Sequence, residues 1–259
     1  NEKTEDEVIS EKSDAAAAQR TTRTVEAEYT RPYIAHAAIG PSCAVASYEN
    51  GGYTVWTHSQ GIYPLRSHMA RALGVEEEKV VAIHVDGAGC YGHNGADDAA
   101  LDAALLARAV PGRPVRLQWA REDEFMWEPY GPAMLVKLKA ELDAGGNIVN
   151  WVEDVYSNPH SSRPSGGGVN LIAAWDLAKP HQPSPPRNPP LPGGGSHRNA
   201  IPIYEFPNQR VTNKLVKRIP VRVSSLRALA EARGLPFFAI SSATGEGIED
   251  LKYALAERV

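Results

Sequence analysis

The chain has 259 residues, a formal net charge of −4 and 42% hydrophobic residues, which is typical of a globular protein with a substantial core. This charge gives no general attraction to nucleic acid or to anionic lipid, and no apolar run is long enough to insert into a membrane. Only two cysteines are present, which excludes a disulfide framework, so we expect a reducing compartment: cytoplasmic, with a periplasmic location left open.

Residues 1–23 are rich in charges and then in alanine. This composition predicts a flexible lead followed by a short helix over Asp14–Gln19. Alternating residues then predict strands over Thr24–Tyr29 and Cys43–Tyr48. The run Asn50-Gly51-Gly52 predicts a hairpin turn before a further strand, "YTVWTHS".

The central part alternates between helical and strand patterns. Apolar residues at helical spacing in "IYPLRSHMARALGV" predict an amphipathic helix that ends at Gly74. A strand is expected over Val80–Val85, a helix over Asp98–Val110, and another strand in "RPVRLQWARED". The stretch "AMLVKLKAELDAGGNIVNWVEDVYSN" predicts two strands joined by a glycine-rich turn.

The composition changes at residues 159–198, where proline and glycine predict an exposed loop or linker. Order is expected to resume at Ala200, and residues 230–259 read as helix, short strand over Pro236–Ile240, glycine turn and helix. We therefore predict an α+β fold, in which mixed sheets with antiparallel hairpins pack against helices, followed by a small α/β tail.

The loop "DGAGCYGHNGADD" joins a predicted strand to a predicted helix and contains four glycines. Such a loop can bring main-chain N–H groups close to an anion. It lacks the Gly-Lys-Ser/Thr of a P-loop, and the surrounding hairpins argue against a dinucleotide fold despite the spacing G-x-G-x-x-G. Two interpretations stay open: a ligand loop contacting the amides of Cys90–Gly92, or a plain turn in which Asp97 or Asp98 caps the helix.

Two further chemistries are less favoured for this loop. A metal site formed by His84, Cys90 and His93 requires three residues of one loop to converge on one point. Cys90 as a nucleophile requires a paired base and an orienting group, and no such pair is identifiable in the sequence.

Residues 13–229 taken together resemble the molybdopterin-binding large subunit of the molybdenum hydroxylases, the relatives of xanthine dehydrogenase and aldehyde oxidase. The resemblance is nearest to the nicotinate dehydrogenase and isoquinoline oxidoreductase branch. Each of the matching segments is weak alone, but they occur in the family's order: "RTVEAEYTRPYIAHAAIGPSCAVA", "VWTHSQ", "GAGCYGHNGADDAALDAALLA", "RPVRLQWAREDEF", "LDAGGNI", "YEFPNQRV" and "PVRVSSLRAL".

This resemblance implies an oxidoreductase that hydroxylates N-heterocycles or aldehydes with oxygen from water. It implies molybdopterin as cofactor, a small-molecule substrate, and an iron–sulfur subunit with flavin or cytochrome as electron partners. By the resemblance, Gln60 matches a glutamine that hydrogen-bonds an oxygen on molybdenum. Gly89, Cys90, Tyr91 and Gly92 match the loop whose backbone approaches the metal, and Arg227 matches a second such stretch. Taken without the resemblance, Gln60 is an ordinary polar residue at a strand end and Arg227 a surface cation.

Two departures from the family pattern affect the expected activity. Cys90 stands where the family usually has glycine. No residue after Leu229 resembles the family's later cofactor contacts or its catalytic glutamate, so we expect no turnover and little or no bound cofactor from this chain alone.

The final residues, "EARGLPFFAISSATGEGIEDLKYALAERV", instead resemble the end of a GTPase domain of the Obg group. A phosphate-binding motif is missing and "TNKLV" lacks the aspartate used to read guanine, so no intact nucleotide site is expected. Two partial domains in one chain suggest a truncated or recombined coding sequence. The alternative function is therefore a non-enzymatic hybrid or GTPase-derived fragment.

Overall fold

A computed structural model describes residues 3–159, 167–191 and 195–218 of the chain. The predicted tail over 230–259 and the candidate residue Arg227 lie outside these residues. The described chain forms two compact units. Unit 1 contains residues up to 34, 131–159 and those from 185 onward to 218; unit 2 contains residues 35–130 and 167–184.

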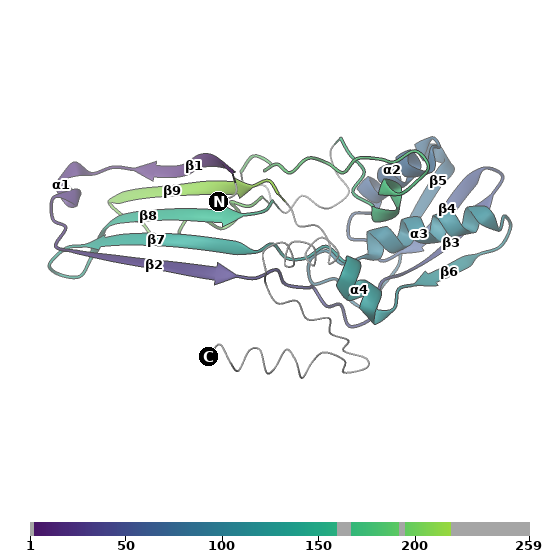
Figure 1. Ribbon diagram of the computed structural model, residues 1–259, viewed down its shortest axis with the longest axis horizontal. Coiled ribbons are helices and arrows are strands. Elements are labelled where there is room, and N and C mark those ends of the chain that lie inside the picture. Colours follow the sequence, from purple (N-terminus) through teal and green to yellow (C-terminus); the bar gives the residue numbers. More distant parts are fainter. Residues whose placement is uncertain (1–2, 160–166, 192–194, 219–259) are drawn as a thin grey trace. The chain divides into compact units, whose positions relative to one another are not determined.

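Unit 1 is a five-stranded mixed sheet with the strand order β1-β9-β8-β7-β2 (Figure 1). Its strands are β1 (Thr4–Lys12), β2 (Arg23–Arg31), β7 (Met134–Leu142), β8 (Ile148–Ser157) and β9 (Asn208–Val216). Strands β8 and β9 run parallel, and the other neighbours are antiparallel. The β7–β8 hairpin confirms the prediction for this segment; its turn is held by Asp143, whose Oδ1 accepts the N–H groups of Gly145 and Asn147 at 2.9 and 3.0 Å.

The flexible lead predicted before residue 14 is wrong, because Thr4–Lys12 forms the edge strand β1 paired with β9. The strand is mostly exposed and rich in charge, so it lacks the apolar alternation that marks a half-buried strand. Its partner lies about two hundred positions later, and cross-strand ion pairs such as Lys214–Asp6 at 2.6 Å contribute to the pairing. The short helix is confirmed as α1 (Ala15–Ala18), with Asp14 as its N-cap.

Unit 2 is a four-stranded sheet, ordered β5-β4-β3-β6, with helices packed on it (Figure 1). Its elements are β3 (Cys43–Glu49), β4 (Gly52–Thr57), α2 (Ile62–Leu73), a 3₁₀ turn (Glu77–Lys79), β5 (Val80–His84), α3 (Ala96–Ala109), β6 (Val115–Gln118), α4 (Arg121–Trp127) and a second 3₁₀ turn (Ile172–Trp175). The mixed sheets, hairpins and packed helices match the predicted α+β class. In the described part of the chain, no helix is long and apolar enough to cross a membrane.

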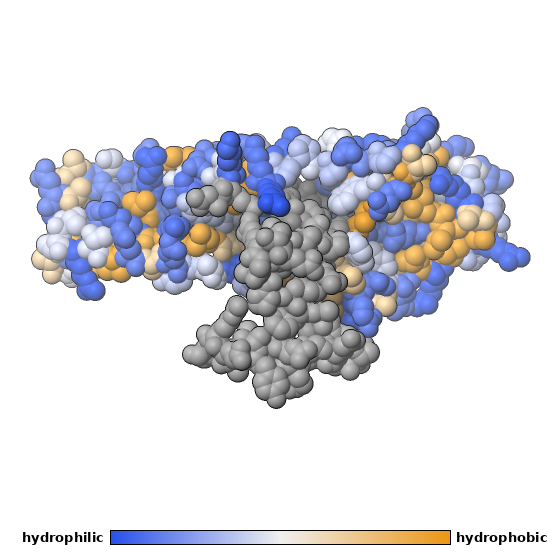
Figure 2. Space-filling model, viewed as in Figure 1, coloured by the Kyte–Doolittle hydropathy of each residue, from blue (hydrophilic) through white to orange (hydrophobic). Residues whose placement is uncertain are grey.

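The core of unit 2 explains why α3 can lie close to the sheet. Ala44 and Ala46 of β3 face the sheet's covered side, and α3 presents a row of buried alanines that includes Ala100 and Ala104. Small side chains on both surfaces allow a close approach of helix and strand. Larger residues such as Leu65 and Leu101 fill the space beside this contact, and both are fully buried. Figure 2 shows apolar residues gathered over this part of unit 2.

The exposed loop or linker predicted over residues 159–198 is wrong for part of its length. Val169, Leu171 and Ala174 are buried in the core of unit 2, beside the 3₁₀ turn Ile172–Trp175.

Two elements of unit 2 also differ from their predictions. The stretch after Gln118 is expected to continue a strand, but residues 121–127 form α4, because Asp123 accepts the N–H of Ala120 at 3.0 Å and starts a helical turn. Helix α3 begins at Ala96, two residues before its predicted start. Both errors come from acidic residues that fit a helix start as well as a loop.

Candidate functional site

Strands β4 and β5 are parallel, so the segments that follow them leave the sheet at the same edge. The first segment carries Ser59 and Gln60, and the second is the glycine loop over residues 85–95. Two hydrogen bonds join the strand ends to these segments: the carbonyl of Thr57 accepts a hydrogen bond from the N–H of Val85 at 2.9 Å, and the carbonyl of Ser59 accepts one from His84 Nδ1 at 2.9 Å. The side chain of Gln60 is exposed at this edge.

The glycine loop has an unusual main-chain conformation. Gly89, Tyr91 and Gly92 have positive φ angles of 91°, 52° and 145°. Tyr91 is 62% exposed and adopts a left-handed conformation that costs a non-glycine residue on the order of 1 kcal/mol. The Cys90 thiol is turned back on the loop and donates to the carbonyl of Gly92 at 3.0 Å. Residues Gly89–Gly92 therefore carry no charged side chain, and the Tyr91 ring lies beside the backbone of Gly89.

The side chain of Asn94 holds the loop through three hydrogen bonds. Its Nδ2 donates to the carbonyl of Gly89 at 3.0 Å and to His58 Nε2 at 3.2 Å, while its Oδ1 accepts the N–H of Ala96 at 3.1 Å. Burial lowers the pKa of His58, so the neutral ring can accept at Nε2. One side chain thus joins the loop, the β4 segment and the first turn of α3.

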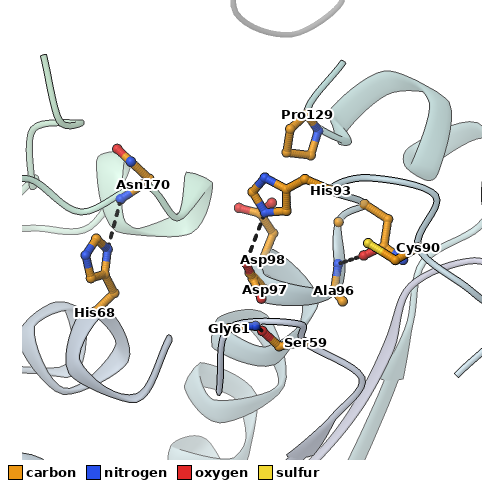
Figure 3. Close-up of polar contacts among 12 residues, drawn as sticks. Ser59, Gly61, His68, Cys90, His93, Ala96, Asp97, Asp98, Pro129 and Asn170 are labelled. Atoms are coloured by element: carbon orange, nitrogen blue, oxygen red, sulfur yellow. Dashed lines mark hydrogen bonds and ion pairs between the residues drawn. The ribbon is translucent and has the colours of Figure 1, made fainter. Parts of the chain in front are cut away.

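The aspartates at the start of α3 are engaged elsewhere, contrary to the capping interpretation. Asp97 accepts a hydrogen bond from His93 Nε2 at 3.0 Å, and both side chains are buried (Figure 3). Asp98 Oδ1 accepts the N–H of Ile172 at 2.8 Å, and the first N–H of the helix is capped by Asn94. Both carboxylates therefore accept hydrogen bonds from groups outside Gly89–Gly92.

The three residues of the disfavoured metal alternative are not brought together. His84, Cys90 and His93 contact Ser59, Gly92 and Asp97 respectively. Across the described residues, no group of three or more histidine, cysteine, aspartate or glutamate side chains could hold a metal ion.

Two buried glutamates that the sequence did not identify lie in helix α4 and at its C-cap. Glu124 is fully buried and accepts the N–H of Ser42 at 2.7 Å and its hydroxyl at 3.0 Å. Its Oε1 also lies 3.5 Å from the amide nitrogen of Gly95, at the end of the loop. Glu128 is fully buried as well, and its Oε1 accepts the N–H of Ala37 at 3.3 Å. Glutamate is usually exposed, so the sequence carries no signal for this role.

His36 is a third residue that the sequence did not identify. Its Nδ1 lies 2.8 Å from the carbonyl oxygen of Pro129, and its ring lies against the backbone of Gly92. A methyl group added at Gly92 would overlap the imidazole.

A separate polar contact ties residues 167–184 to helix α2. His68 is 2% exposed, and its Nδ1 accepts the N–H of Asn170 at 3.3 Å (Figure 3). Burial, with the charge of Arg71 as a smaller cause, lowers the pKa of His68 to about 4. This histidine is therefore neutral and structural near pH 7.

The candidate residues are thus placed as follows. Gln60 and the loop residues Gly89, Cys90, Tyr91 and Gly92 lie in the two segments that leave one edge of the unit 2 sheet. Arg227 lies outside the described residues.

Comparison with known proteins assigns this arrangement to a family. The family described as "Molybdopterin cofactor-binding domain" matches residues 1–182. A nicotinate dehydrogenase subunit of Pseudomonas putida is 39% identical over 198 residues, covering 76% of this chain and 15% of the relative. The chain thus spans a small part of that relative's length. The crystal structure of quinoline 2-oxidoreductase from Pseudomonas putida 86 has the same fold, with a TM-score of 0.59 at 16% identity, over 90% of this chain and 30% of that one.

A different similarity covers a shorter stretch. GTPase Obg of Solibacter usitatus is 61% identical over 44 residues, which are 17% of this chain and 13% of that protein. Both resemblances seen in the sequence are therefore confirmed, and the longer one includes the glycine loop. The chain belongs to the molybdopterin cofactor-binding domain family of the molybdenum hydroxylase large subunits.

Proposed function

We propose that unit 2 supplies one wall of a molybdenum-cofactor site in an oxidoreductase that hydroxylates N-heterocycles or aldehydes with water-derived oxygen. The observation that carries this proposal is the exposure of the residues Tyr91 and Gly92, in the loop that leaves the sheet at the same edge as Gln60. When bound, the cofactor would supply the redox centre that accepts electrons from the substrate. The chain's own residues orient it: the loop amides donate hydrogen bonds, and the Gln60 amide offers a donor and an acceptor.

The residues present fit a polar, anionic cofactor. The loop has small residues at Gly89, Cys90 and Gly92, and positive φ angles at its glycines can direct main-chain N–H groups toward a ligand. Of the carboxylates nearby, Asp97 and Asp98 are buried and hydrogen-bonded to His93 and Ile172, whereas Asp86 at the start of the loop is exposed. This supports the assignment of Cys90–Gly92, rather than the α3 N-terminus itself, as the contact.

The same geometry argues that this chain does not retain the cofactor by itself. Tyr91 and Gln60 are both exposed, whereas a bound cofactor usually has ~70–90% of its surface buried. Further protein surface is needed to cover it. We therefore propose that the purified chain binds little or no cofactor and turns over no substrate. Elemental analysis after expression in cells that make the cofactor should give far less than one molybdenum per chain; a value near one would contradict this.

A segment exchange tests the proposed function directly. In the Pseudomonas putida nicotinate dehydrogenase, the matched 198-residue segment is replaced by that of this chain. We expect the hybrid enzyme to bind molybdenum cofactor, and the same hybrid with Gly92→Val to lose it. Cofactor content is measured by molybdenum analysis and by pterin fluorescence after release. A folded hybrid that binds no cofactor would remove the proposal, and equal content with Gly92→Val would remove the role of the loop.

Partners follow from the same proposal. The matched relative is itself named as one subunit of its enzyme. We propose that electrons leave through an iron–sulfur subunit, and from there to flavin or cytochrome, as the resemblance implies. Copurification of the segment-exchanged chain with the iron–sulfur partner of nicotinate dehydrogenase would support this.

The alternative is a non-enzymatic hybrid or GTPase-derived fragment, favoured by the 44-residue similarity to GTPase Obg. Because the sequence lacks a P-loop, we expect a flat response when the chain is titrated with a fluorescent GTP analogue. Saturable micromolar binding would favour the alternative over the first proposal.

A further inference from the structure

The glycine loop meets a histidine that no sequence motif assigns. The edge of the His36 imidazole that bears Nε2 and Cδ2 lies against Gly92, so closely that a Cβ on residue 92 would overlap it. Gly92 has a φ of 145°, which L residues rarely adopt, so its conformation and its contact both require glycine. The backbone of Gly92 is therefore packed directly on the ring of His36.

The orientation of this ring is fixed by one hydrogen bond. His36 Nδ1 lies 2.8 Å from the carbonyl oxygen of Pro129, which can only accept, so Nδ1 carries the proton. The opposite nitrogen, Nε2, is then the one turned toward Gly92. A ring held this way presents a defined edge to the loop, whereas an unrestrained imidazole could rotate.

The backbone that carries His36 is also restrained. Ala37 has a φ of 51°, unusual for a residue other than glycine, and its N–H donates to the buried Glu128 at 3.3 Å. Glu128 and Pro129 are adjacent and follow α4, so one short segment holds both the ring and the backbone of the His36–Ala37 turn. Two left-handed residues, Ala37 and Tyr91, are the chain neighbours of the two residues in contact.

We propose that His36 is a positioning residue, which holds the Tyr91–Gly92 peptide of the glycine loop in the orientation used to contact the cofactor, with its ring set by Pro129. This inference rests on the function proposed above for the significance of the loop. The contact itself is a property of the cofactor-free chain.

The test measures amide hydrogen exchange of the full chain without cofactor, comparing peptides over residues 86–95 with peptides from β7 and β8. Replacing His36 by alanine should accelerate exchange in the loop on the order of tenfold and leave β7 and β8 unchanged. Two partial variants separate the two contacts. His36→Phe keeps a ring beside Gly92 without a donor to Pro129, and His36→Asn keeps a donor without the ring edge. In both variants, the amides of the loop should exchange faster than in the parent chain.

A double-mutant comparison adds a second readout. Gly92→Ala should accelerate loop exchange strongly in the parent chain and by a smaller factor on the His36→Ala background, because there the overlap with the ring is gone and only the strain of the φ of 145° remains. Gly95→Ala is the matched control, since its Cβ would overlap Trp119 instead, and its effect should be equal on both backgrounds. If Gly92→Ala does not fold, the loop exchange rates of the His36 variants alone decide whether the proposal holds.

Three results would overturn the proposal: unchanged loop exchange in His36→Ala, full restoration by His36→Phe, or an equal effect of Gly92→Ala on both backgrounds. The second would reduce His36 to a space-filling side chain. Because no cofactor is present, these outcomes are independent of the segment exchange, whose failure would instead remove the proposed function.

Discussion

The side chains of Glu124 and Glu128 lie one helical turn apart at α4, and neither is exposed to solvent. Their surroundings differ. The carboxylate of Glu124 accepts two hydrogen bonds from Ser42, whereas the Oε1 of Glu128 accepts the N–H of Ala37, and within the described part of the chain its Oε2 has no partner. Burial raises the pKa of Glu128 to about 7, and the charge of Glu124 adds to this.

Replacing Glu128 by glutamine should change how stability depends on pH. The folded pKa of about 7 exceeds the usual 4.5, so the folded state binds more protons between these values and stability falls as pH rises through this window. The total loss is roughly 3 kcal/mol. Glu128→Gln does not titrate, so its stability relative to the parent should be higher at pH 8 than at pH 5. Thermal denaturation of the full chain measures this, with the exposed Glu122→Gln as control; parallel pH curves would contradict it.

His68 should produce a pH dependence of the opposite sign. Its folded pKa of about 4 lies below the usual 6.5, so stability is fully present above 6.5 and is lost as pH falls toward 4. The total loss of unfolding free energy is again roughly 3 kcal/mol. His68→Asn keeps an acceptor for the Asn170 N–H without a titrating ring, so the acid loss attributable to this site should disappear. Urea denaturation at pH values of about 4.5 and 7.5, on either side of the usual histidine pKa, tests this. An unchanged difference between the two conditions would count against it.

Asn94 should be needed for the loop more than for the helix. Asn94→Ala removes two donors and the acceptor for Ala96, and should cost roughly 2–4 kcal/mol. Asn94→Asp keeps the acceptor at the start of α3 but loses both donors, so it should cost less while still loosening the loop. Limited proteolysis between residues 86 and 93 distinguishes the two effects. Equal loop protection in Asn94→Asp and the parent would refute the role of these donors.

Asn208 should hold the N-terminal strand in unit 1. Its Oδ1 accepts the N–H of Asp14 at 2.6 Å, and its Nδ2 donates to the carbonyls of Asp14 and Val149 at 2.9 Å each. Asn208→Ala leaves these groups unpaired and should weaken the docking of residues 4–18 by roughly 2–3 kcal/mol. Faster amide exchange in that segment measures the effect. Asn150→Ala, which removes one bond to Glu141, is the control and should leave the segment's exchange unchanged.

The elements that were predictable from sequence are those set by local contacts. The β3–β4 turn needs positive φ at Asn50 and Gly51, and both have it. The β7–β8 turn and the end of α2 at Gly74 have similarly local causes. In contrast, β1 depends on a partner strand that is distant in sequence, and its exposed charges hide its pairing.

The candidate site likewise has one part that the sequence predicts and another that it does not. The glycine loop was visible because glycines and a strand-to-helix transition occur close together in the sequence. The supporting residues were not, since His36 and Glu128 come from parts of the chain that are distant in sequence from the loop. Buried glutamates also contradict the expectation that charged residues are exposed, so composition alone cannot reveal them.

The main-chain conformation of the glycine loop has a consequence for how this surface tolerates substitution. Contacts made by main-chain amides do not depend on which side chain a residue carries, so Cys90 can vary without altering what the loop donates. Gly92 has no such latitude, because a methyl group there meets an imidazole. A saturation library over Gly89–Gly92 should therefore tolerate many substitutions at Cys90 and very few at Gly92.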